Sequence, residues 1–216
     1  MEDLSNTREL TLEQIARVEG VNAGNSFLKG DYSQAAMRYL AEARMEAFVK
    51  DEAKKAELIN KSIAFAFIAP INQATHKVIC ALCLNEVAQR SPLAGLVNKL
   101  YREDIISREE VVKIEQLLPS ILKAKDADGI SRLDQAAFSH NMIPIINSFS
   151  TIKLKTLAGL INIKDTKELL ILLEKTYQGG EIKIDQLDEV VRINTSLNMA
   201  ETVKEFLSQI DTIIGE

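Results

Sequence analysis

The stretch TYQGGEIKIDQLDEVVRI, residues 176–193, decides the fold because its apolar spacing differs from that of the chain around it. Apolar residues alternate with polar ones in two short runs, which contain Ile182 and Ile184, then Val191 and Ile193. Alternation with a period of two is typical of strands that have one buried face. The stretch therefore predicts two strands, over 181–186 and 189–194, in a chain that otherwise has helical periodicity. Its acidic residues allow a second interpretation, a cation site or a catalytic carboxylate cluster made of Asp185, Asp188 and Glu189.

The composition indicates a globular protein and excludes several classes of function. The chain has 216 residues, of which 46% are hydrophobic and 26% charged, enough for a sizeable buried core. Its net charge of −5 gives no basic surface for nucleic acid or an anionic membrane. The acidic start MEDLSNTREL is not a signal peptide, and no apolar run is long enough to span a bilayer. Two cysteines without a signal peptide favour a reducing, intracellular setting.

The first part of the chain predicts packed helices. Residues 8–50 have helical periodicity that is interrupted by a turn at Gly30 and Asp31. Alanines beside tyrosines on the second of these helices allow close antiparallel packing, as in a helical-repeat unit. Further helices are predicted over 55–69, 73–90, 93–102 and 107–118, and the last of them begins with a capping box of Ser107 and Glu110.

The second part predicts a winged helix. A helix over 131–140 is followed by an apolar segment, 141–149, that we expect to be bent or short because of Pro144. A short strand around Ile152 and Leu154 precedes two helices, over 155–162 and from Asp165 to Gly179. With the two strands of the opening stretch, the order is helix, strand, helix, helix, strand, strand. Three short helices cannot close a core alone, and a three-stranded antiparallel sheet would cover them.

The predicted fold class is therefore mainly α, with a helical-repeat segment followed by a winged-helix subdomain and a C-terminal helix. The expected boundaries are 1–130, 131–195 and 196–216. The last helix carries an unbroken apolar stripe at helical spacing, and we expect it to pack against partner helices in a bundle or coiled coil. The stripe consists of Met199, Val203, Phe206, Leu207, Ile210, Ile213 and Ile214.

Candidate metal and catalytic residues are few, and each has a structural interpretation that we prefer. His76, Cys80 and Cys83 share a helical face, but a structural zinc site needs four ligands. Asp126 begins a loop with a faint likeness to a calcium site, but Ala137 stands where a bidentate glutamate is required. His140 has no nucleophile motif to serve. We predict no metal, no cofactor and no catalytic residue.

A winged helix could also bind DNA, and charge decides against this alternative. The helix that would enter the major groove lies within 165–178 and has a net charge of −1. Residues 151–193 contain seven basic and seven acidic side chains. Contacts to phosphate supply most of the non-specific affinity for nucleic acid, and this segment has no net positive charge to make them.

Four segments carry a resemblance to the PCI-domain family, whose members occur in the COP-9 signalosome, the proteasome lid and translation initiation factor three. They are KLYREDIIS (99–107), DADGISRLDQAAFSHNM (126–142), LAGLINI (157–163) and GGEIKIDQLDEVVRI (179–193). Their order and spacing resemble the signalosome members most closely, over about residues 30–216. Ser139 and Glu189 depart from the family pattern, since acidic and glycine residues are usual at these positions. The chain also lacks most of the N-terminal repeats of the family, as a fragment or a short form would.

The resemblance implies a non-catalytic scaffold subunit of the signalosome, which removes Nedd8 from cullins through a metalloprotease motif in another subunit. It implies PCI and MPN subunits as partners, cullin contact through the N-terminal repeats, and a location in cytoplasm and nucleus, with no nucleic acid or membrane. The residues expected at the protein interface are those of the tail stripe together with a set on the predicted sheet. This sheet set is Ile152, Leu154, Ile182, Ile184, Asp185, Val191 and Ile193.

Overall fold

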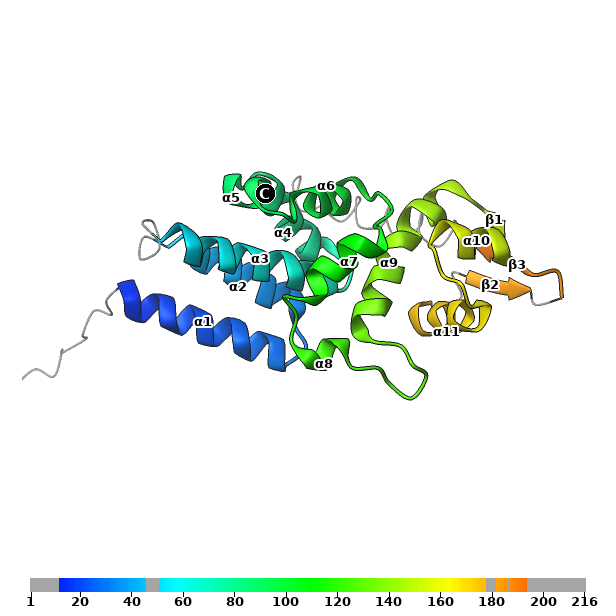
Figure 1. Cartoon of the computed structure of the whole chain (residues 1–216), viewed down its shortest axis with the longest axis horizontal. Helices are drawn as coiled ribbons and strands as arrows, with labels where there is room; N and C mark the ends of the chain where they lie inside the picture. The colour runs from blue at the N-terminus through cyan, green and yellow to red at the C-terminus, as the bar shows by residue number, and fades with distance from the viewer. Residues whose placement is uncertain (1–11, 46–50, 178–181, 186, 194–216) are drawn as a thin grey trace, which may run out of the picture. The chain divides into compact units, whose positions relative to one another are not determined.

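The computed structural model describes residues 12–45, 51–177, 182–185 and 187–193, and these residues form two compact units. The helical unit comprises 1–102 and 106–123, and the winged-helix unit comprises 103–105 and 124–216. The described chain is mainly helical, with one small antiparallel sheet in the winged-helix unit, so the predicted fold class is confirmed (Figure 1). The predicted tail helix over 196–216 lies outside the described residues.

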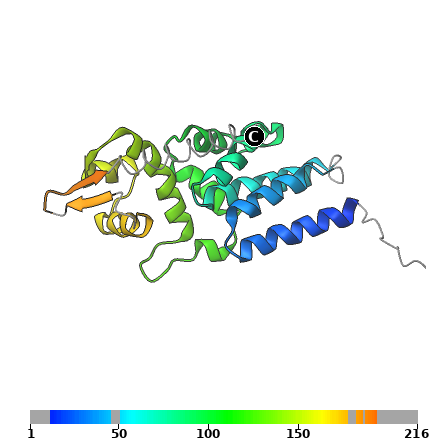
Figure 2. The same cartoon turned by 180° about the vertical axis from the view of Figure 1, so that it is seen from behind.

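The helical unit begins with three helices that lie side by side, α1 (Leu12–Leu28), α2 (Tyr32–Ala43) and α3 (Glu52–Ile68) (Figures 1 and 2). Gly30 takes a φ of +77° in the turn between α1 and α2, a conformation that costs glycine little. Asp31 then caps α2 by accepting a hydrogen bond from the Gln34 N–H at 3.0 Å. Ala35 and Ala36 are fully buried, so the expected close packing of small residues is found on α2.

Buried hydroxyls tie these helices together. The Ser62 hydroxyl on α3 donates to the Ala36 carbonyl on α2 at 2.8 Å. Ser33 on α2 and Thr75 on α4 (Gln73–Cys83) share a hydrogen bond of 2.8 Å. Each hydroxyl is buried and paired, so it costs little to desolvate and fixes the register of neighbouring helices.

The predicted helix over 73–90 is wrong in one respect, because the structure divides it into two. Helix α4 ends at Cys83, and α5 (Glu86–Arg90) begins two residues after Leu84. The Asn85 side chain accepts hydrogen bonds from the N–H groups of Val87 and Ala88, and therefore starts a new helix. Three shorter helices complete the unit, α6 (Ala94–Arg102), α7 (Arg108–Glu115) and α8 (Ser120–Lys123), and α7 has the predicted capping box.

The winged-helix unit begins with α9 (Arg132–Ser148), which runs through Pro144 without ending. The expectation of a bent or short segment at 141–149 is therefore wrong as to length. Proline lacks one backbone N–H, but the apolar face on both sides of it is buried, with Met142 and Ile145 at 0% and 2% exposure. Burial of this face outweighs the loss of one hydrogen bond.

The remaining elements follow in the predicted order, β1 (Thr151–Lys153), α10 (Leu154–Leu160), α11 (Thr166–Thr176), β2 (Ile182–Asp185) and β3 (Val190–Ile193). Asp165 caps α11 through the Lys167 N–H, as predicted. The sheet is antiparallel with the order β1-β3-β2, so β3 is the central strand. One face of the sheet covers an apolar core to which α9, α10 and α11 contribute Met142, Leu157, Leu169 and Leu172.

Candidate assembly surface of the winged-helix unit

The β2–β3 hairpin confirms the strand pair predicted from the opening stretch. In its register, Ile182 lies opposite Ile193, and Ile184 lies opposite Val191. Asp185 shapes the turn, because its carboxylate accepts hydrogen bonds from the N–H groups of Leu187 and Asp188, both at 3.2 Å. Such side-chain bonds to the backbone two or three residues ahead are typical of aspartate in turns. This carboxylate therefore holds the turn of the hairpin.

The turn closes through a residue with positive φ. Glu189 has a φ of +51°, and its carbonyl accepts a hydrogen bond from the Leu154 N–H at 2.8 Å. Its carboxylate lies 3.4 Å from Lys155 Nζ, and both side chains are largely exposed. Glycine adopts this backbone conformation more readily than glutamate. Glu189 therefore adopts a strained backbone conformation.

The structure places the predicted interface residues of the sheet in three settings. Ile152, Leu154, Val191 and Ile193 are buried in the core of the winged-helix unit, with exposures of 4%, 5%, 0% and 7%. Ile182 and Ile184 are partly buried and pack against this core. Asp185 holds the turn. The tail stripe, Met199 to Ile214, lies outside the described residues.

The outer edge of β2 is the feature of this hairpin that suits a partner. The Ile193 N–H donates to the Ser150 carbonyl, and the Leu154 N–H donates to the Glu189 carbonyl. The backbone N–H and C=O groups of the odd-numbered residues of β3 therefore point toward β1. Backbone groups alternate between the two edges of a strand, so Val190 and Arg192 face their β2 partners Asp185 and Lys183. The N–H and C=O groups of Ile182 and Ile184 consequently point to the outer edge of β2. Within the described residues, no strand pairs with that edge.

A clamp between a loop and α11 was not predicted. Lys175 Nζ lies 2.5 Å from Asp126 Oδ2 and 2.6 Å from Asp128 Oδ2. The other oxygen of Asp126 accepts the N–H groups of Asp128 and Ile130. The hydrogen bond from Lys175 holds the pKa of Asp126 below its usual value, and those from the two N–H groups act in the same direction. Because 49 residues separate Asp126 from Lys175, sequence periodicity gives no signal for the pair.

The other candidates from the sequence have structural surroundings. His76 is exposed and stacks on Tyr101 with ring centroids 6.3 Å apart. Cys83 donates a weak hydrogen bond to the Val97 carbonyl at 3.7 Å, and burial raises the pKa of its thiol. His140 is buried within α9 at 6% exposure. In the part of the chain that the structure describes, no three His, Cys, Asp or Glu side chains are grouped to hold a metal ion.

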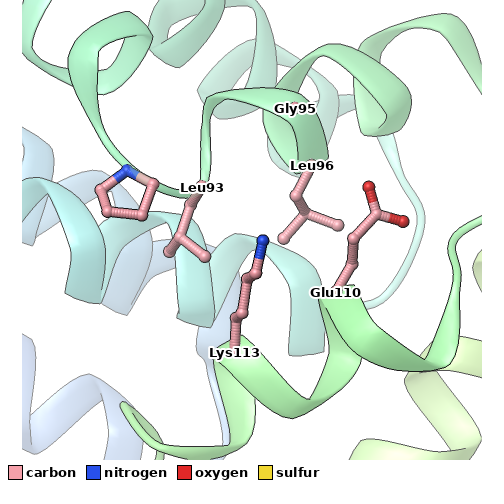
Figure 3. A pocket seen from close by; sticks show the side chains of 6 residues that line it. Leu93, Gly95, Leu96, Glu110 and Lys113 are labelled. Carbon is pink, nitrogen blue, oxygen red and sulfur yellow. The ribbon is translucent and has the colours of Figure 1, made fainter.

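A cavity in the helical unit lies between α6 and α7 (Figure 3). Its volume is about 40 Å³, and it is lined by Pro92, Leu93, Gly95, Leu96, Glu110 and Lys113. Glu110 is engaged, since it accepts hydrogen bonds from Lys99 at 2.8 Å and from Ser107. Burial alone would raise the pKa of Glu110, but these bonds lower it overall. The cavity has room for water and is far smaller than a metabolite pocket.

The fold class is mainly α, and the order of a helical segment followed by a winged helix with a three-stranded antiparallel sheet matches a PCI-like arrangement. Over most of its length the chain is similar to COP9 signalosome complex subunit 4. It is 28% identical to that of Drosophila melanogaster over 161 residues, which is 74% of this chain and 39% of the relative. The identity to the Emericella nidulans protein is 24% over 73% of this chain and 42% of the relative.

A third relative, from Neurospora crassa, is 21% identical over 68% of this chain and 34% of its own length. The chain thus spans about two fifths of the length of the curated relatives it matches. No protein-family model matches the chain. Among the described residues, no helix is both long and apolar enough to cross a bilayer.

Proposed function

We propose that this chain is a non-catalytic subunit of a COP9 signalosome and that it joins neighbouring subunits through the outer edge of β2. The similarity to three subunit 4 proteins carries the proposal, since it extends over 68–74% of the chain. In this proposal the complex removes Nedd8 from cullin-RING ligases in cytoplasm and nucleus, and a different subunit performs the hydrolysis. This chain supplies a scaffold among PCI and MPN subunits.

The hairpin supports the proposed surface in two ways. First, the backbone groups of Ile182 and Ile184 point away from β3 and have no strand partner within the described residues. Exposed edges of this kind bind extended segments of other chains by adding a strand to the sheet. Second, the hairpin is anchored, because Val191 on β3 is fully buried and Asp185 holds the turn. An anchored edge loses little conformational entropy on binding.

One substitution tests the edge without disturbing the hairpin ladder. Proline at position 184 removes an N–H that points to the outer edge, and proline is tolerated in edge strands at such positions. Ile184→Thr is the matched control, because threonine keeps the N–H and loses a comparable amount of apolar surface. We expect Ile184→Pro to lower co-purification of the other signalosome subunits by about tenfold, a free-energy loss of about 1.4 kcal/mol. Ile184→Thr is expected to leave it within about twofold.

The measurement is quantitative mass spectrometry of the tagged chain purified from its source cell, with circular dichroism of each variant to verify folding. Equal recovery of partner subunits with both variants would show that the edge of β2 does not bind them. Recovery of proteasome-lid or initiation-factor subunits in place of signalosome subunits would contradict the proposed complex. Both results are decisive because the partners are identified directly.

A further inference from the structure

The solvent face of the winged-helix sheet carries a cluster of basic side chains that neither the fold nor edge pairing requires. The core face of the sheet takes Ile152, Val191, Ile193, Ile182 and Ile184. The opposite face therefore presents two rows across the three strands. The first row is Lys183, Arg192 and Thr151, and the second is Asp185, Val190 and Lys153.

These residues concentrate positive charge in an acidic chain. Lys153, Lys183 and Arg192 are exposed, and Asp185 is the one acidic side chain in the two rows, so the face has a net charge of +2. The whole chain has a net charge of −5. Arg192 lies 3.6 Å from Asp185, a loose pair with the arginine side chain 62% exposed. Within the described residues, Lys153 and Lys183 form no ion pair.

The arrangement of the charges is unfavourable for the sheet alone. Lys183 lies directly opposite Arg192 in the β2–β3 register. Like charges in this position repel and destabilise an antiparallel pair. The core of the unit does not need either side chain, since both Lys183 and Arg192 are exposed. The repulsion would be relieved by an anionic group bound between the two side chains.

We propose that this solvent face binds an acidic, extended segment of a partner protein, with carboxylates of the segment placed between Lys183 and Arg192 and beside Lys153. Charge complementarity identifies the occupant. A polyanion such as duplex DNA needs a broad positive field, but residues 151–193 have no net charge as a whole. A short acidic segment needs only the local cluster of Lys153, Lys183 and Arg192.

This proposal does not depend on the proposed subunit role. Edge pairing uses the backbone groups of Ile182 and Ile184, whereas this face acts through side chains. The experiment therefore uses the full chain in isolation. The probe is a fluorescein-labelled peptide of alternating threonine and glutamate, with the corresponding threonine–glutamine peptide and a short duplex DNA as comparison ligands. Binding is followed by fluorescence anisotropy at low and at physiological salt.

The test variant is Lys183→Gln/Arg192→Gln. Its matched control, Lys164→Gln/Lys167→Gln, removes the same amount of charge from exposed positions before and at the start of α11. We expect the test variant to weaken binding of the glutamate peptide about tenfold and the control to change it less than about twofold. Equal weakening by both variants, or no binding of the glutamate peptide by the unaltered chain, would overturn the proposal. Tighter binding of the duplex than of the glutamate peptide would also overturn it.

A second variant separates loss of binding from loss of folding. Lys183→Glu places an acidic side chain opposite Arg192, so it should raise the melting temperature while it lowers affinity for the glutamate peptide. A destabilised protein that has merely lost its hairpin would show a lower melting temperature. A fall in melting temperature would therefore refute the like-charge repulsion on which the proposal rests.

Discussion

At the scale of single residues, Glu189 shows how one side chain can depart from what its backbone position favours. Its φ of +51° lies in the left-handed region, where residues other than glycine carry a cost of about 1–2 kcal/mol. Its ion pair with Lys155 contributes little stability, because the side chains of Glu189 and Lys155 are 59% and 85% exposed. The hairpin keeps this conformation because the Glu189 carbonyl pairs with the Leu154 N–H.

We therefore predict that Glu189→Gly stabilises the chain. Relief of the strain is partly offset by the greater freedom of glycine in the unfolded state, so the expected gain in the free energy of unfolding is about 0.5 kcal/mol. Urea denaturation measures it. Glu189→Gln is the control, since it removes the charge and keeps the strain, and it should leave stability within about 0.3 kcal/mol. A gain equal to that of the glycine variant would mean that charge, not conformation, is responsible.

Glu42 is a second residue in unfavourable surroundings, because its carboxyl group is buried. It lies on α2 at 6% exposure, and its Oε2 has no hydrogen-bond partner among the described residues. Burial raises the pKa of Glu42, while Lys54 and Lys61 act in the opposite direction and Glu19 and Glu57 add to the increase. Space beside it is also limited, because a Cβ atom at Gly20 of α1 would lie 3.3 Å from Glu42 Oε1.

The sign of the pH dependence follows from this direction. A carboxyl group whose pKa is higher in the folded state binds its proton more tightly there, so stability falls as the pH rises through its titration. We predict that Glu42→Gln raises the melting temperature at pH 7 and that the gain disappears below about pH 4, where the unfolded carboxyl is also protonated. Thermal denaturation at pH 7 and below about pH 4 measures it. A gain that does not vary with pH would exclude the carboxylate as its cause.

At the scale of elements, the sequence predicts the winged helix from two kinds of local signal. The period of two in Ile182, Ile184, Val191 and Ile193 distinguishes strands from helices, and the Asp165 cap locates the start of α11. Two features were beyond these signals. The division of α4 from α5 depends on the Asn85 cap, and the continuity of α9 through Pro144 depends on burial of its apolar face. The continuity of α9 is decided by tertiary packing, which local helix propensity does not reveal.

The candidate surface was predicted less completely, for a related reason. Alternation along a strand shows that one face is apolar, but the same pattern fits a core and a partner interface. The strand order β1-β3-β2 resolves this for Val191, because the central strand is covered by the unit's own helices and Val191 is fully buried. Which backbone groups remain at the outer edge also depends on strand order, which requires contacts between residues far apart in the chain.

This burial gives a prediction for Val191→Ala. Loss of two methyl groups from a fully buried site on β3 should lower the free energy of unfolding by about 1.5–3 kcal/mol. Urea denaturation followed by circular dichroism measures the change. Val112→Ala is a suitable comparison, since Val112 on α7 is 40% exposed and its substitution should cost less than about 1 kcal/mol. Comparable costs at the two positions would show that Val191 does not belong to the core.

At the scale of the whole molecule, the chain combines two compact units with a terminal segment that has a different amphipathic pattern. The described residues form the helical and winged-helix units, and the winged-helix unit has an apolar core of its own. The stripe from Met199 to Ile214 is known from sequence only, and its seven large apolar residues exceed what a small winged helix needs to close. A role in assembly therefore stays a prediction that concerns the whole chain and its partners.

We predict that removal of residues 197–216 leaves both units folded and abolishes co-purification with partner subunits. Burial of each large side chain of the stripe contributes up to about 1.5–3 kcal/mol before ordering costs, so its loss should abolish detectable association. Circular dichroism and partner recovery from the source cell measure the two effects. Phe206→Asp should weaken recovery of partners in the full chain, whereas Gln209→Asp, off the stripe, should not. Full recovery with the truncated chain would show that assembly uses the described units alone, and the edge of β2 would then have to supply the affinity.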